Sequence, residues 1–337
     1  LGLGALASPL LLAGLVPAGL YLLARRGRLG RARWILAFAF YLAGGATPIV
    51  PVTLGNYYVG QDFVPIASQD GLEFYLGNRA GADGSTPEAP ELRPAWYGGL
   101  RDADRMAEEA LGRPLKPSEV SDYWLARGLN AVRQAPGRWL NLLLRKWVLF
   151  WQAFEVPGGD DLYFFSRYSF LFRGPFLLTF GAVAPLGLAG VVLALRRRKP
   201  IALLAGFVLA YALCATLYLV NGPVRAPMAP LLCVPAAWFL HEAWRQLRRR
   251  NWRLIVPETL LFLGAFLFVN ADFYRLAARH DFSRSWLRLG AYHAARGEVP
   301  QAGPAQAQPG PDPQEQGRRQ GECAQGIAEE EGPQAIG

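Results

Sequence analysis

Three cationic side chains lie within or beside strongly apolar sequence, where a fixed positive charge could bind an anion. Arg145 and Lys146 interrupt the aromatic run 139–154, and Arg225 is the basic residue of the short segment 221–228. A guanidinium presents planar donors that match a phosphate, whereas an ammonium acts as a point charge. These three residues are therefore candidates for phosphate binding. The alternative is non-specific contact with lipid headgroups.

Polar side chains that could hydrogen-bond to a ligand occur in two places. Gln69, Asn78 and Asp83 lie in a glycine-rich stretch, and Glu155 follows the aromatic run. Their amide and carboxylate groups could bind hydroxyl groups or orient a cation, but the same residue types also form turns and helix ends. The adjacent aspartates at 160–161 are not expected to act as an acid/base pair, because neighbours in sequence rarely share a pocket.

The sequence contains no evident metal or cofactor motif. Its three histidines are far apart, and its three cysteines show no metal-ligand spacing. A structural zinc site and a disulfide framework are therefore not expected. A divalent metal is left open, because residues outside this chain could supply ligands.

The composition indicates a membrane protein. Hydrophobic residues make up 52% of the 337 residues and charged residues 18%, with a formal net charge of +9, and the mean hydropathy is +0.13. Soluble domains usually contain roughly 25% charged residues. This combination argues against collagen-like, wholly disordered and disulfide-framed secreted chains. Nucleic-acid binding is not expected either, because the arginine clusters lie between apolar segments.

Six apolar segments approach the length of about 20 residues that a helix needs to cross a bilayer. They cover residues 3–24, 34–52, 175–195, 200–220, 227–244 and 254–271. The fifth contains three prolines, which neighbouring helices can accommodate. The predicted fold class is an α-helical polytopic membrane protein with about six transmembrane helices, interfacial helices and an α-rich outer loop domain.

Arginine-rich loops set the predicted orientation. They lie at 25–33, 196–199 and 245–253. The positive-inside rule places such loops in the cytoplasm. Residues 53–174 and the C-terminus are then expected on the outer side of the cytoplasmic membrane, in a multi-pass protein.

The aromatic run 139–154 tests this count of spans. A helix of that length is only about 24 Å long, and counting it as a span would turn the later basic loops outward. We therefore expect an interfacial helix with Trp139, Trp147 and Trp151 at headgroup level. Residues 162–173 form a second aromatic stretch of the same kind.

The predicted outer loop domain contains two helices, near residues 101–111 and 117–134. Ser118 is the expected N-cap of the second helix, and Pro136 stops it. Its apolar stripe, which includes Trp124, is expected to pack on the membrane domain. The stripe consists of Val120, Trp124, Ala131 and Val132.

The C-terminal region divides into a helical segment and a polar tail. Residues 286–297 resemble the first helix of a tetratricopeptide repeat, although one such helix cannot bury its own face. The tail is rich in Gly, Pro, Gln and Glu and is expected to be disordered. The predicted divisions are 1–52 and 175–271 in the membrane, 53–138 outside, 139–174 at the interface, 272–300 as the outer helical segment and 301–337 as the tail.

Several motifs together resemble one family of membrane enzymes. They are NYYVGQDFVPIASQDGLEFYLGN (56–78), GADG (81–84), EVSDYW (119–124), PGRWLNLLLRKWVLFWQAFE (136–155) and VRAPMAPLL (224–232). In this order and spacing they are similar to the C-terminal half of bacterial glycosyltransferase family 39 proteins. That group includes protein O-mannosyltransferase-like and aminoarabinose-transferase-like enzymes, some with C-terminal tetratricopeptide repeats.

This resemblance implies a C-type glycosyltransferase fold. It also implies transfer of a sugar from a polyprenyl-phosphate carrier to an acceptor protein or glycolipid on the outer face of the membrane. The presumed catalytic Asp of such enzymes lies near the N-terminus, upstream of Leu1. The chain is therefore expected to be a truncated fragment without that carboxylate. The family often has an Arg-x-Arg-x-Pro-like pattern where this sequence has only Arg225.

The resemblance gives the candidate residues specific roles. Arg225, Arg145 and Lys146 would bind the lipid phosphate, with Arg225 the first choice, and Gln69, Asn78, Asp83 and Glu155 would bind substrate. A second hypothesis is a non-catalytic membrane scaffold with a periplasmic repeat domain. A transporter of lipid-linked sugars is a third, but it would place charged groups inside the spans, and the apolar segments contain few.

Overall fold

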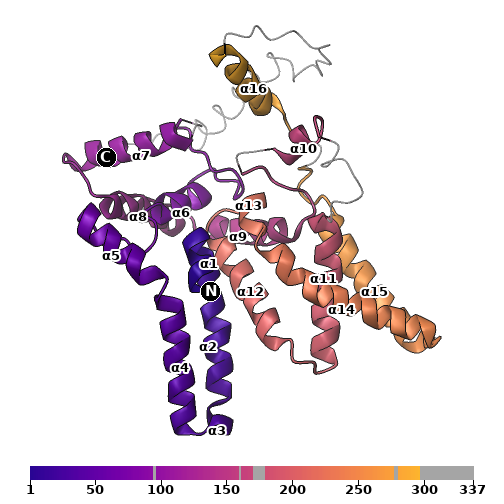
Figure 1. Cartoon of the computed structure of the whole chain (residues 1–337). Helices are drawn as coiled ribbons and strands as arrows, with labels where there is room; N and C mark the ends of the chain where they lie inside the picture. Colours follow the sequence, from indigo (N-terminus) through magenta and orange to yellow (C-terminus); the bar gives the residue numbers. More distant parts are fainter. Residues whose placement is uncertain (94–95, 159–160, 170–178, 277–279, 297–337) are drawn as a thin grey trace, which may run out of the picture. The chain divides into compact units, whose positions relative to one another are not determined.

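The computed structural model describes residues 1–337 except 94–95, 159–160, 170–178, 277–279 and 297–337. Every regular element among the described residues is a helix (Figure 1). The α-helical class predicted from the sequence is confirmed. The chain divides into two compact units, Leu1–His280 and Asp281–Gly337.

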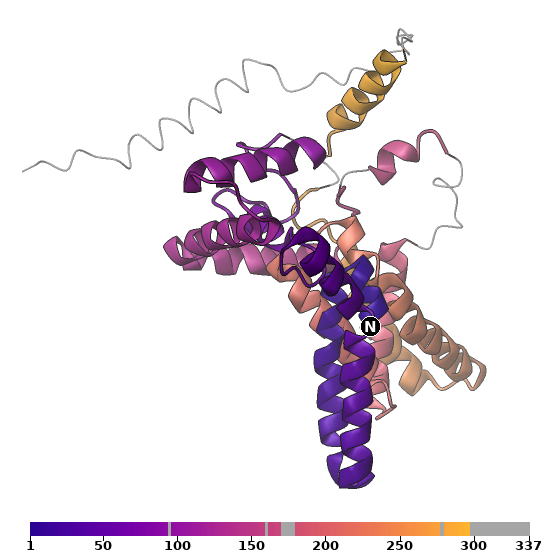
Figure 2. The same ribbon diagram turned by 60° about the vertical axis from the view of Figure 1, so that its left-hand side comes forward.

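The N-terminal helices form a hairpin, in which α2 (Leu15–Ala24) contacts α4 (Arg31–Ala46). Figures 1 and 2 both show these two helices side by side. The Tyr41 hydroxyl donates to the carbonyl of Leu15, and the Trp34 indole donates to that of Leu22 at 3.0 Å. The short helix α3 (Arg26–Leu29) makes the turn, which ends at Gly30 with φ of +73°. The hairpin therefore places the first basic loop at its tip.

Prolines break both of the first two predicted spans. Residues 3–24 divide into α1 (Gly2–Ala7), the 3-10 helix η1 (Pro9–Gly14) and α2. The second span continues beyond its predicted end as α5 (Ile49–Gly60), with a 46° bend after α4. Pro48 lies at this bend. Proline lacks a backbone N–H and clashes with the carbonyl four residues earlier, which explains the break.

The remaining apolar helices form a bundle. It consists of α11 (Phe180–Arg196), α12 (Ala202–Leu217), α14 (Met228–Arg248) and α15 (Trp252–Asn270). Helix α11 packs on α14 at Gly187 and Gly190, where an added Cβ would lie 2.9 Å from Leu232 Cβ and 2.1 Å from the carbonyl oxygen of Pro235. Such small residues let helix backbones approach closely.

Helices α6 (Asp70–Asn78), α7 (Trp96–Leu111) and α8 (Pro117–Gln134) form a second packed region of the first unit. Trp124 is fully buried between them, with its ring 4.8 Å from that of Tyr75 and its indole donating to the carbonyl of Ala103 at 3.2 Å. The predicted apolar stripe thus packs through Trp124 on α6 and α7, and the same cluster includes Leu219 from the predicted apolar segment 200–220.

The predicted start of α8 is confirmed, but its predicted cap is wrong. The N-cap residue is Lys116, whose backbone N–H donates to Glu119 at 2.9 Å. Ser118 lies two residues further along, in the first turn, and is bound to Asp62 instead, through its hydroxyl at 2.6 Å and its backbone N–H at 2.8 Å. A carboxylate distant in sequence therefore takes the place of the local cap.

Helix α9 (Pro136–Trp151) contains the predicted interfacial run. Its last turn is in the main core, where Leu149, Phe150 and Trp151 are buried among side chains of the bundle. Trp151 is therefore covered by protein side chains, and its position at headgroup level stays a prediction. Trp139, at the other end, donates its indole N–H to Asn78 at 3.0 Å. One side of the helix is thus packed, whereas Leu140 and Leu144 are exposed on the other, and the interfacial position of α9 stays a prediction.

Two smaller helices complete the first unit. Helix α10 (Leu162–Phe165) follows Asp161, whose carboxylate accepts from the backbone N–H groups of Tyr163 and Phe164. Helix α13 (Gly222–Arg225) follows Asn221, which caps it in the same manner at the N–H of Val224. Residues 170–173 of the second predicted aromatic stretch lie outside the described residues.

The second compact unit contains α16 (Ser283–Ala295), which agrees with the helix predicted there. Trp286, Leu287 and Tyr292 are exposed on it. The predicted disordered tail, residues 301–337, lies outside the described residues.

Among the described residues, one helix is long and apolar enough by itself to cross a membrane, namely α15 with 19 residues. The bent pair of α4 and α5 passes the same test together, whereas α11 and α12 are apolar but shorter. At 1.5 Å per residue, 17 residues of α11 extend about 26 Å, against a hydrocarbon core of ~30 Å.

Candidate functional site

Lys146 is the most deeply buried of the predicted cations. Its side chain is fully buried on α9, and its ammonium donates to Asn78 Oδ1 at 3.0 Å. Asn78 is buried at the end of α6, and its amide donates to the carbonyls of Phe74 and Leu217 at 2.9 and 2.8 Å. Two predicted site residues, 68 positions apart, are thus brought into direct contact.

The turn that carries Asp83 covers Lys146. Gly84 has φ of +83°, and a Cβ added there would lie 2.7 Å from Lys146 Cγ. Asp83 holds this turn, because its carboxylate accepts from the backbone N–H groups of Ser85 and Thr86 at 2.9 and 2.8 Å and from both hydroxyls. Asp83 therefore has the turn-forming geometry that the sequence left open as an alternative to substrate binding.

Electrostatics in this cluster depend on burial. Desolvation lowers the pKa of Lys146 to about 7, and the nearby charge of Asp83 opposes this shift. Burial alone would raise the pKa of Asp83, but hydrogen bonds from Thr86 and Ser85 outweigh it and lower that pKa. Lys146 is consequently a lysine that changes its charge near neutral pH, in contact with an uncharged amide.

Arg225 holds the end of α9. Its guanidinium is almost fully buried and donates to the carbonyls of Leu149, Gln152 and Phe154, the last at 2.8 Å, and to Glu155 at 2.7 Å. These carbonyls belong to the last turn of α9 and the residues after it, where the helix leaves carbonyl groups without an intrahelical partner; that of Leu149 also accepts from the backbone N–H of Gln152 at 3.3 Å. Both terminal nitrogens of Arg225 are thus bound to protein groups.

Arg145 differs from the other two cations. Its guanidinium carbon lies 5.1 Å from the centre of the Tyr274 ring. Its Nε is buried and has no hydrogen-bond partner among the described residues. Arg145 precedes Lys146 by one position on α9, so it points to a different side of the same helix. The Nε of Arg225 is unpaired in the same way. Arg145 differs in that no hydrogen bond or ion pair joins its guanidinium to the described protein groups, whereas both terminal nitrogens of Arg225 are bound.

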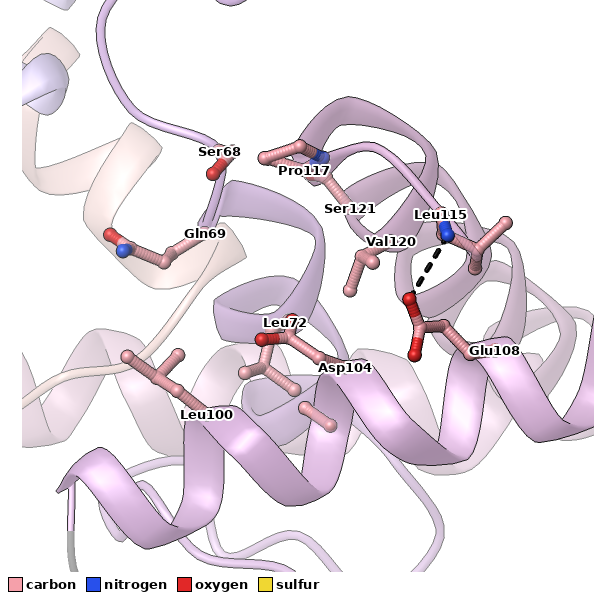
Figure 3. A pocket seen from close by; sticks show the side chains of 11 residues that line it. Ser68, Gln69, Leu72, Leu100, Asp104, Glu108, Leu115, Pro117, Val120 and Ser121 are labelled. Carbon is pink, nitrogen blue, oxygen red and sulfur yellow. Dashed lines mark hydrogen bonds between the residues drawn. The ribbon is translucent and has the colours of Figure 1, made fainter. Parts of the chain in front are cut away.

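Gln69 lies apart from this cluster, beside a pocket of about 260 Å³ between α6, α7 and α8. Figure 3 shows the pocket, with Asp104 and Glu108 from α7 and Ser121 from α8. Glu108 accepts from the backbone N–H of Leu115 at 3.1 Å. Burial and the neighbouring charge of Glu108 raise the pKa of Asp104. None of the other predicted site residues lines this pocket.

Two contacts were not foreseen from the sequence. Asp161 Oδ2 lies 2.9 Å from Nε2 of His280, which also packs against Phe154 and Tyr163. The Tyr163 hydroxyl in turn accepts from the backbone N–H of Glu155 at 2.9 Å. The sequence contains no local signal for this pairing, because 119 positions separate Asp161 from His280.

Within the described residues, no group of three or more His, Cys, Asp or Glu side chains is arranged to hold a metal ion. Comparisons with protein-family models, with curated proteins and with solved structures found no match to this chain. The geometry itself defines a helix, α9, that is fixed at two points by buried cations and presents a third cation beside an aromatic ring.

Proposed function

We propose that this chain is the C-terminal part of a membrane glycosyltransferase. The enzyme would move a sugar from a polyprenyl-phosphate carrier to an acceptor protein or glycolipid on the outer face of the cytoplasmic membrane. The observation that carries this proposal is the arrangement on α9. Lys146 and Arg225 fix the helix through their bonds to protein groups, whereas the guanidinium of Arg145 makes no hydrogen bond or ion pair with the described residues. A phosphate leaving group gains negative charge as the glycosidic bond breaks, and a fixed cation stabilises it.

The roles of the site residues follow from their contacts. Arg145 contacts the carrier phosphate, while Arg225, Lys146, Asn78 and Glu155 position the helix that bears it. The preferred phosphate ligand is therefore Arg145, whereas the sequence alone favoured Arg225. A phosphate would have to displace the carbonyl and carboxylate partners of Arg225, whereas Arg145 loses only a ring contact.

Membrane insertion, with about six spans and the multi-pass orientation predicted from the basic loops, belongs to the same proposal. Large apolar side chains are exposed along the hairpin and α15, including Leu20, Phe40 and Leu260. Only 11% of the apolar 18-residue stretch of α15 is buried inside the protein. Contiguous apolar surface of this kind is typical of a face that contacts lipid.

The phosphate role is tested by replacing Arg145 with Gln in the full-length protein. We expect affinity for a polyprenyl-phosphate-linked sugar, measured by binding in detergent, to fall by about tenfold or more, the loss typical of a charge-assisted hydrogen bond. Arg138→Gln is the matched control, because Arg138 lies exposed on the first turn of the same helix. Equal affinities for wild type and Arg145→Gln would contradict the phosphate role.

The orientation is tested separately by single-cysteine labelling in intact cells, after replacing the native cysteines. A cysteine at exposed Ala80 is expected to react with an impermeant reagent from outside, and one at exposed Gly27 only after permeabilisation. The reverse pattern would overturn the orientation. A scaffold without catalytic function would keep the orientation but show no binding of the carrier.

A further inference from the structure

A second cavity lies between α11, α14 and α15, near the end of the bundle that carries Arg197 and Arg245. Its volume is about 270 Å³, and its lining is mostly apolar. The apolar residues are Leu186, Phe239, Leu240, Ala243, Ile255 and Phe262. Two polar residues, Glu258 and Thr259, complete the lining. A carboxylate in the wall of an apolar cavity requires a partner for its charge.

Arg197 pairs with only one oxygen of the Glu258 carboxylate. Its guanidinium binds Glu242 through one terminal nitrogen and Glu258 Oε1 through the other. Glu242 is further held by Arg245 at 2.7 Å and by the Gln246 amide at 2.5 Å. Both carboxylates are almost fully buried. All three of these groups bind the same oxygen of Glu242, Oε1, and the network gives Glu258 a bond at Oε1 alone.

Glu258 Oε2 is buried and has no hydrogen-bond partner among the described residues. An unpaired buried carboxylate oxygen costs free energy, which a ligand carrying an N–H donor would recover. Because the walls of the cavity are apolar, such a ligand must combine the donor with an apolar body. The neighbouring Arg245 has 46% of its side chain exposed and is available to an anionic group of the same ligand.

We propose that this cavity binds the headgroup of a phospholipid with a primary amine, of the phosphatidylethanolamine type. Its ammonium donates to Glu258 Oε2, its phosphate contacts Arg245, and the upper part of an acyl chain lies along the apolar wall. The zwitterionic headgroup has one positive and one negative charge, which would face Glu258 and Arg245, respectively. A choline headgroup has the same charges but no N–H donor, so the site discriminates against it.

The size of the cavity supports a headgroup rather than a whole lipid. Pockets that enclose a complete small ligand usually have ~300–1,000 Å³, more than is present here. The remainder of the acyl chains would leave the cavity over Leu240, which lines it and has 53% of its surface exposed. This inference rests on the proposed membrane insertion but not on sugar transfer or on the role of Arg145.

The test is lipid binding by the purified full chain in detergent, followed by native mass spectrometry. The probes are dioleoyl phosphatidylethanolamine, its N-methyl and N,N-dimethyl derivatives, and dioleoyl phosphatidylcholine. We expect wild type to bind the ethanolamine lipid about tenfold more tightly than the choline lipid, with the loss concentrated at the last methylation, which removes the last N–H. Glu258→Gln is expected to abolish this preference.

Two further variants keep the test decisive. Ala243→Phe fills the cavity and leaves Glu258 and Arg197 unchanged, so it should weaken binding of both lipids even if Glu258→Gln folds poorly. Glu109→Gln removes an exposed carboxylate on α7 and should match wild type. Equal binding of the two lipids by wild type, an undiminished preference in Glu258→Gln, or undiminished binding of both lipids by Ala243→Phe would overturn the proposal. A protein that binds the carrier through Arg145 but shows no headgroup preference would overturn this inference alone.

Discussion

Lys146 gives the sharpest test of the packing around α9. Burial lowers its pKa from 10.5 to about 7, so between these values the unfolded chain binds a proton that the folded chain does not. Stability must therefore rise with pH across this interval. The cost of keeping this lysine buried is about 4 kcal/mol at neutral pH and shrinks toward zero as the pH approaches the unfolded value.

Lys146→Met removes the titrating group but keeps the aliphatic contact with Gly84. Asn78 Oδ1 still accepts from the Trp139 indole, so the substitution leaves no orphaned acceptor. Between about pH 7.5 and about pH 9.5, the free energy of unfolding of wild type should rise by about 2–3 kcal/mol relative to that of the variant. Reversible chemical denaturation of both proteins in detergent, repeated across the pH range, measures this difference.

The exposed Lys116 provides the control, and Lys116→Met should follow the pH profile of wild type. Parallel profiles for wild type and Lys146→Met would refute the reasoning, because they would mean that Lys146 keeps its ordinary pKa and that water reaches it. A steeper profile in the variant would refute the sign of the effect.

Three further substitutions test other contacts by thermal unfolding. Arg225→Lys should destabilise the protein by about 2–4 kcal/mol, because one ammonium cannot satisfy several carbonyls and a carboxylate; a loss near zero would show that the α9 terminus is held otherwise. Gly84→Ala should cost more than Gly81→Ala, since both have positive φ but only the first would meet Lys146 within 3 Å; equal costs would contradict the close approach. For Asp62, burial raises the pKa but hydrogen bonds from Ser118 outweigh it and lower the pKa, so stability should fall as the pH falls through that pKa, and Asp62→Asn should remove this acid sensitivity.

Local signals predicted the positions of helices better than their continuity. Pro117 and Pro136 fixed the limits of α8 because proline acts on the backbone within its own turn. The same chemistry divided two apolar segments that composition alone treats as single spans, as the bend at Pro48 illustrates. Hydropathy averages over such breaks, whereas a missing N–H acts at one residue.

The candidate site was only partly predictable. Residue types identified Lys146, Asn78 and Arg225 as unusual, but not that two of them are structural contacts of α9. That distinction depends on partners such as Leu217 and Gln152, which lie far away in the sequence and are brought close only by tertiary packing. The Ser118 cap failed for the same reason, since a long-range partner displaced the local one.

Helix α9 also has a mechanical consequence. It is fastened to α6 through Asn78 and to α13 through Arg225, so a shift of either region acts on the helix. A displacement of α6 would therefore either carry α9 with it or break the hydrogen bond between Lys146 and Asn78.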